Sequence, residues 1–211
     1  MYRKLTIVCL ATAGLWSGYV AAEPQDILIS ASVAFADADY QINGVNYDGD
    51  LDLGVVSSRF YLTDQVYASV TSSSGDGTIA NVSFDTATLS LGAGVVLLDR
   101  VDYVKGTGSE LRVGFDYSDT EVTAGNITAD DTSTDLLVGY TAGLGNGLSA
   151  FAGYSANLDE FGDNYGLSAG LYKSLGGNWL IGGSYQVAES DLGGGDTSEV
   201  SGIQVGIGYA F

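Results

Sequence analysis

The chain has 211 residues, with 26 acidic residues against seven basic ones, 31 glycines, 14 tyrosines, one proline and no histidine. A net charge of −19 repels nucleic-acid phosphates, so we expect no nucleic-acid partner. The length suits a single domain, and the many Tyr, Val, Leu and Gly residues favour strands joined by tight turns.

Residues 1–22 have the layout of a secretory signal peptide. Arg3 and Lys4 form a basic start, an apolar run follows, and small residues precede the polar chain after Ala22. We expect cleavage after Ala22; an uncleaved membrane anchor is the alternative. Cleavage would remove the only cysteine, Cys9, and leave five basic residues against 26 acidic ones.

Beyond the signal peptide, no stretch approaches the ~20 continuous apolar residues that a membrane helix needs. Strand-like runs instead alternate with stretches rich in Asp, Gly, Ser and Asn, and each run is near the ~9–11 residues of a tilted transmembrane strand. We therefore predict that 23–211 is an all-β, up-and-down antiparallel transmembrane β-barrel of ten strands, or eight if two weak runs merge. The ten runs are 26–36, 50–62, 65–73, 83–98, 108–119, 132–144, 147–155, 164–174, 177–188 and 199–211.

Apolar residues occupy alternate positions in several runs, and alternate strand residues share a face. In the last run one face is apolar and the other is nearly all glycine, which predicts a lipid-facing side and a small-residue lumen. A soluble lipid-binding barrel would instead need its large apolar side chains inside. In the second run the apolar phase changes between Val55 and Val56, where a bulge is possible. The apolar faces are Ile27, Ile29, Ala31, Val33 and Phe35; Leu89, Leu91, Ala93, Val95 and Leu97; Leu111, Val113, Phe115 and Tyr117; Trp179, Ile181, Tyr185 and Val187; and Ile203, Val205, Ile207, Tyr209 and Phe211.

The links between runs alternate in length. Short turns are expected in the periplasm and long loops outside, with both termini periplasmic. The link at 99–107 breaks the alternation, and an extension of the fourth strand would account for it. The short links are 63–64, 143–147 and 175–177, and the long acidic ones are 37–49, 74–82, 120–131, 156–163 and 189–198.

Two segments resemble a known family. The strand–turn–strand RFYLTDQVY at 59–67 and the ending on Tyr209 and Phe211 are similar to the small outer-membrane β-barrel proteins grouped with the OmpA transmembrane domain and OmpX, the porin-family proteins. The resemblance covers 23–211. It implies location in the Gram-negative outer membrane, contact with outer-membrane lipid and lipopolysaccharide, and insertion by the barrel-assembly machinery as a monomer. Tyr209 and Phe211 would form the C-terminal assembly signal.

The sequence offers little for catalysis or metal binding. The enzymes among small outer-membrane barrels rely on histidine, so its absence predicts that this chain is no enzyme and needs no cofactor. The acidic stretches at 48–52 and 190–193 lack the spacing and terminal Glu of a calcium loop. Solvated acidic loops are the better interpretation, with weak cation bridging to lipopolysaccharide as the alternative.

Aromatic residues near the predicted strand ends suggest the girdle that such barrels place at the membrane interfaces. Lys173, near a short turn, can extend its ammonium group to the lipid headgroups. The predicted girdle residues are Tyr61, Tyr140, Tyr154, Trp179, Tyr209 and Phe211.

Arg112 shares the inward face of its run with Glu110 and Asp116. A buried cation needs a carboxylate, so we expect Arg112 to pair in the lumen with Glu110, Asp116 or Asp135, and Arg59 to join if a bulge turns it inward. Such a pair would either gate a pore or brace the wall. The predicted function is a narrow porin-like channel for small solutes or ions; the alternative is a structural or adhesive surface barrel without transport.

Overall fold

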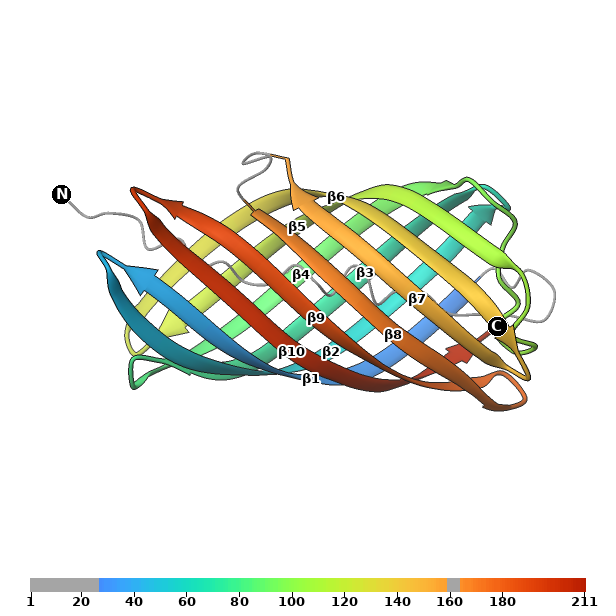
Figure 1. Cartoon of the computed structure of the whole chain (residues 1–211), viewed down its shortest axis with the longest axis horizontal. Coiled ribbons are helices and arrows are strands. Elements are labelled where there is room, and N and C mark those ends of the chain that lie inside the picture. Colours follow the sequence, from blue (N-terminus) through green and yellow to red (C-terminus); the bar gives the residue numbers. More distant parts are fainter. Residues whose placement is uncertain (1–26, 159–163) are drawn as a thin grey trace.

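The computed structural model describes residues 27–158 and 164–211, which form a closed antiparallel barrel of ten strands (Figure 1). The predicted all-β class and strand count are therefore confirmed, whereas the predicted signal peptide at 1–22 lies outside the described residues. No helix in the described part of the chain is long and apolar enough to span a membrane. The strands are β1 (Ile27–Ile42), β2 (Val45–Thr63), β3 (Val66–Ile79), β4 (Val82–Val96), β5 (Ser109–Ala124), β6 (Ile127–Gly145), β7 (Leu148–Asn157), β8 (Asn164–Gly176), β9 (Trp179–Gly193) and β10 (Asp196–Ala210).

Every strand pairs with its neighbours in the chain, and β1 closes the barrel against β10. The closing ladder runs from Leu28 opposite Ala210 to Gln41 opposite Thr197. Closure leaves no sheet edge, so the backbone polar groups of each strand are satisfied by the two adjacent strands. We call the end that carries Phe211 the C-terminal end and the end of the β1–β2 hairpin the distal end.

The faces follow the predicted alternation. Large apolar side chains in the first, fourth, fifth, ninth and last runs point out of the barrel, as Val205 does with 47% of its surface exposed. The inward positions carry mostly Ser, Thr, Gly and Ala. This arrangement contradicts the soluble lipid-binding alternative, because the apolar surface faces outward.

The bulge suggested between Val55 and Val56 is absent, so this prediction is wrong. β2 pairs with β1 without any shift from Phe60 opposite Ile27 to Val45 opposite Ile42. Leu51, Leu53 and Val55 therefore point inward like the buried Arg59. The apolar phase changes because this part of the lumen wall is itself apolar, while the backbone stays regular.

Four of the five long loops expected at one end are mostly strand, and most of the fifth, 156–163, lies outside the described residues. Strands β2 and β6, each 19 residues long, continue far past the ~9–11 residues needed to cross a bilayer. Two-residue turns close these four hairpins: at Asn43 and Gly44, for example, φ is +52° and +75°. Asn-Gly is the sequence that such primed turns favour. The Asp, Gly and Ser content looked loop-like, but these residues still pair across strands.

The outward face changes composition along the strands. On β1 the outward residues are apolar from Ile27 to Phe35, and Asp37 and Asp39 follow. These nine residues of β1, at about 3.3 Å each and a tilt of roughly 40°, rise by about 22 Å, close to the ~25 Å apolar band of outer-membrane barrels. The apolar band thus surrounds the C-terminal half, and the distal half extends beyond it.

We expect Val205→Arg to lower the free energy of unfolding by about 2–4 kcal/mol, because a cation would face hydrocarbon. Urea unfolding from lipid vesicles measures this. Glu199→Arg is the matched control, since it lies on the same face of β10 in the acidic half and should be tolerated. Equal stabilities of the two variants would show that the band is misplaced.

Candidate functional site

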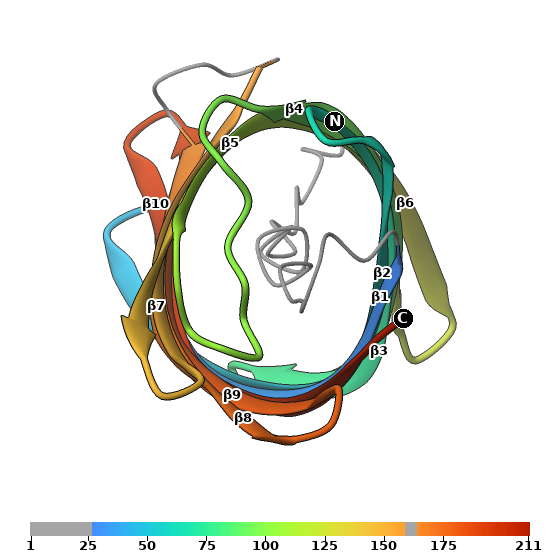
Figure 2. The same ribbon diagram turned by 90° about the vertical axis from the view of Figure 1, so that its right-hand side faces the viewer.

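The lumen is narrowed at the C-terminal end by the strap, which we define as residues 97–108 between β4 and β5. β4 ends at Val96, so the fourth strand does not extend into this link as suggested. The strap instead passes across the opening (Figure 2). Asp102 and Thr107 form a bridge within it, and backbone N–H groups at the end of β6 and the following turn donate to its carbonyls: Gly143 to Gly108, Gly145 to Gly106 and Gly147 to Lys105.

Apolar side chains hold the strap inside the barrel. Val101 and Tyr103 are almost fully buried among inward residues of β1 and β7–β10. The rings of Phe151 and Tyr172 stack with centroids 4.5 Å apart, and Tyr103 meets Tyr172 edge-on at 6.1 Å. The full cluster, which sequence patterning did not reveal, is Leu28, Val101, Tyr103, Phe151, Tyr172, Leu180 and Ala210.

A charged layer lies next to this cluster. Arg112 Nε lies 2.8 Å from Glu110 Oε1, and Glu110 is only 1% exposed. The hydroxyl of Tyr61 donates to the same carboxylate at 3.4 Å. The guanidinium of Arg112 lies against Gly139, where even a Cβ would come within 3.4 Å of it. Glycine at this position therefore lets the long side chain lie along the wall.

The other predicted partners form a second row. Asp116 on β5 stands directly opposite Asp135 on β6, and both are buried in the lumen. Oδ1 of Asp116 lies over Gly92, in the same cross-strand row as Ser69 and Arg59. The structure thus brings Arg112 to Glu110, and it places Asp116 four residues further along β5.

Tyr61 does not belong to the predicted aromatic girdle. It is 7% exposed and points into the lumen, because β2 keeps its alternation up to Tyr61 and its register with β3 shifts only between Tyr61 and Thr63. Its ring lies 3.6 Å below the guanidinium carbon of Arg100, and 6.4 Å from the ring of Tyr67. Arg59 in turn lies over Tyr67 at 4.8 Å. Tyr61 is therefore part of the charged layer.

The other five girdle candidates lie on outward positions. Tyr209 contacts Trp179 and Phe211 edge-on, at 4.9 and 4.8 Å between centroids. Tyr117 and Tyr185 are also outward and half exposed, and the girdle prediction did not include them. Nearby, Lys173 Nζ donates to the carbonyl of Asn146 in the adjacent turn. The outward candidates are Tyr140, Tyr154, Trp179, Tyr209 and Phe211.

Distal to the charged layer, part of the lumen wall is lined by hydroxyl groups. Their oxygens pair across strands, as between Ser90 and Ser118 at 2.8 Å and between Thr88 and Thr120 at 3.0 Å. Such pairs satisfy buried hydroxyls without placing charge in the lumen.

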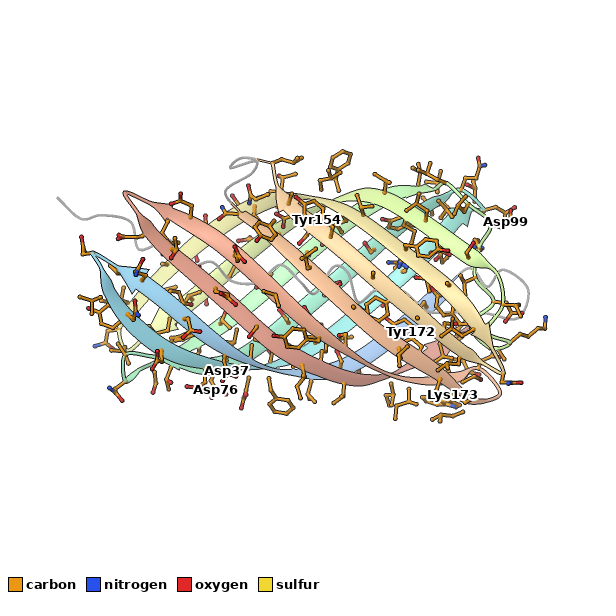
Figure 3. All side chains as sticks on the ribbon, viewed as in Figure 1. Asp37, Asp76, Asp99, Tyr154, Tyr172 and Lys173 are labelled. Carbon is orange, nitrogen blue, oxygen red and sulfur yellow. The ribbon has the colours of Figure 1, made fainter. Side chains whose placement is uncertain are left out.

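The outside of the distal half is strongly acidic, as Asp37 and Asp76 show in Figure 3. Asp76 stands directly between Asp52 and Asp85 on the neighbouring strands. The stretches compared with calcium loops belong to β2 and β9, and the described residues contain no cluster of three potential metal ligands. The basic residues after position 22 all lie in the C-terminal half: Arg59, Arg100, Lys105, Arg112 and Lys173.

No known family model matches the chain, and no curated protein does. Solved structures do match. The translocator domain of autotransporter NalP from Neisseria meningitidis is 13% identical with a TM-score of 0.53, and the match covers 95% of this chain and 92% of that one. Neisserial surface protein A is 10% identical with a TM-score of 0.44, and the match covers 87% of this chain and 97% of that one. The attachment invasion locus protein Ail of Yersinia pestis is 15% identical with a TM-score of 0.39, and the match covers 89% of this chain and 100% of that one. The chain shares its antiparallel β-barrel fold with the NalP translocator domain.

We expect Arg112→Met to lower the free energy of unfolding by about 3–5 kcal/mol, because it removes the cation that directly contacts the buried carboxylate of Glu110. Adding Glu110→Gln should restore most of the loss. Urea unfolding of both variants from lipid vesicles measures these free energies. A double variant no more stable than the single one would contradict a direct dependence of Glu110 on Arg112.

We also expect Asp76→Asn to raise the free energy of unfolding by about 0.2–1 kcal/mol at low salt, because it relieves repulsion from two facing carboxylates. The gain should largely disappear at ~1 M salt, where screening is strong. Ser74→Asn, on the same face of β3, is the control. A gain that is independent of salt would point to a cause other than charge.

Proposed function

We propose that the protein is a narrow channel of the outer membrane that passes small solutes or ions slowly. The observation that carries this proposal is the inward wall, whose Ser, Thr and Gly positions on β3–β5 continue from the distal half to the charged layer. Small hydrophilic side chains leave room for water in a lumen of this kind.

In this proposal the charged layer and the strap form the constriction. The pair of Arg112 and Glu110 lies beside Tyr61, and Tyr103 brings the strap into the apolar cluster at the C-terminal end. A path between the two ends must pass these groups, which accounts for slow rather than free passage.

A structural or adhesive surface barrel is the second candidate. It is favoured by the extended distal half, where residues 127–132 of β6 are exposed at every position although they belong to a strand. A strand segment exposed on both faces, next to an acidic surface, offers contact area to a partner. In this case the strap would seal the lumen permanently.

Either function fits an outer-membrane location, with the distal half outside the cell among lipopolysaccharide and the C-terminal end in the periplasm. We propose insertion as a monomer by the barrel-assembly machinery, with Tyr209 and Phe211 as its C-terminal signal. We propose no catalytic activity, because the sequence has no histidine to act as a base.

Planar-bilayer recordings of the purified protein test the channel. The proposal expects small discrete conductance steps. Their complete absence from protein shown to be folded would refute the channel and favour the surface barrel.

We expect Tyr103→Ala to increase the single-channel conductance, because it removes the largest strap side chain from the lumen. Tyr140→Ala is the matched control: this tyrosine points outward and should leave the conductance unchanged. Arg112→Ala should increase the conductance if its pair gates the pore, and only lower stability if the pair is a brace. An unchanged conductance in Tyr103→Ala would show that the strap is not the constriction.

A further inference from the structure

An apolar recess opens in the lumen wall between β1, β2, β9 and β10. Its lining includes Leu51, Leu53 and Val55 of β2, with Ala36 of β1 and Val200 of β10. The empty space at this point, open lumen included, is about 440 Å³. The recess differs from the hydroxyl-lined part of the wall on β3–β5.

Two buried amides border this recess. Gln186 Nε2 donates to Gln204 Oε1 at 2.5 Å, and Gln204 Nε2 donates to Ser32 Oγ at 2.5 Å. In this pair Gln186 is the donor, and its own carbonyl oxygen is buried. Gln186 is 6% exposed, and among the described residues no group donates to its Oε1. A buried acceptor without a donor is costly, so the site favours an occupant that supplies one.

The recess is continuous with apolar residues further towards the distal end. Val200 packs with Ala38 and Tyr40, whereas Leu51 packs with Phe84 and Val122. All of these are lumen-facing positions, so the apolar lining continues from the recess towards the distal end.

We propose that this recess is a binding site for a small alcohol, whose apolar body lies against Leu51, Leu53 and Val55 and whose hydroxyl donates to Gln186 Oε1. The site goes beyond the proposed channel function and does not depend on it. Binding can be measured in a barrel that conducts nothing.

Cyclopentanol and cyclopentanone form a matched pair of probes, because they share size and ring but only the alcohol has a donor. The protein in lipid nanodiscs is titrated with each, and methyl NMR shifts of Leu51, Leu53 and Val55 report occupancy at the recess. We expect saturable shifts at these methyls and a preference for cyclopentanol of about threefold to tenfold, the value of one net hydrogen bond. Empty nanodiscs correct for partition into lipid.

Two variants and one control separate the contribution of the amide acceptor from that of the apolar recess. Gln186→Leu should bring the two affinities to within about twofold of each other, because it removes the acceptor. Ser149→Ala, which also alters a buried lumen side chain but lies outside the recess, should keep the preference. Ala36→Leu should abolish binding of both probes by filling the recess.

Equal affinities of the two probes for the parent protein would overturn the proposal. So would probe-induced shifts confined to methyls outside the recess. Because these readouts need no current, absence of conductance steps would refute the channel and leave the alcohol site standing.

Discussion

Closure of the hydrogen-bonded ladder is the constraint on which the rest of this structure depends. Once β10 pairs with β1, the alternation of side chains is coupled around the whole barrel. Val33 faces Val205 on the outside, and the next pair, Ala34 and Gln204, faces the lumen. A slip of one residue would exchange these faces and bring glutamine into contact with lipid. The same pairing satisfies the backbone groups within the hydrocarbon, where water cannot do so.

Within that ladder, glycine decides where long polar side chains can lie. Gly139 lies beneath the guanidinium of Arg112, and Gly92 lies beneath the carboxylate of Asp116. Gly94 and Gly114 likewise leave space for the hydroxyl of Tyr67. A Cβ at Gly92, Gly94 or Gly114 would overlap these groups, and at Gly139 it would press closely on the guanidinium. Small residues on the inward face therefore leave the lumen open and also leave space in which long polar side chains can lie against the wall. The charged layer depends on this space.

Charge is separated along the barrel axis. The acidic outward residues follow the end of the apolar band, as Asp37 and Asp39 follow Phe35 on β1. Facing carboxylates such as Asp52 and Asp76 are tolerated there because water and salt weaken their repulsion. In the lumen, where screening is weaker, Glu110 is joined directly to Arg112. The facing lumen carboxylates Asp116 and Asp135 lie in the same cross-strand row as Arg59.

The sequence by itself determined the all-β class, the number of strands and the outward face of runs such as that of Val205, because a period of two is a local property of the chain. It also placed Arg112 and Glu110 on one face. It could not choose among the carboxylates for Arg112, or show that Leu51 and Tyr61 face the lumen, since an apolar lumen wall imitates a change of phase. The distal hairpins were missed because Asp, Gly and Ser suggest loops unless a neighbouring strand pairs with them. Only the tertiary structure decided that the strap enters the lumen with Tyr103 and that β1, β2, β9 and β10 enclose the recess at Gln186, because those contacts join residues far apart in the chain that meet only after the barrel closes.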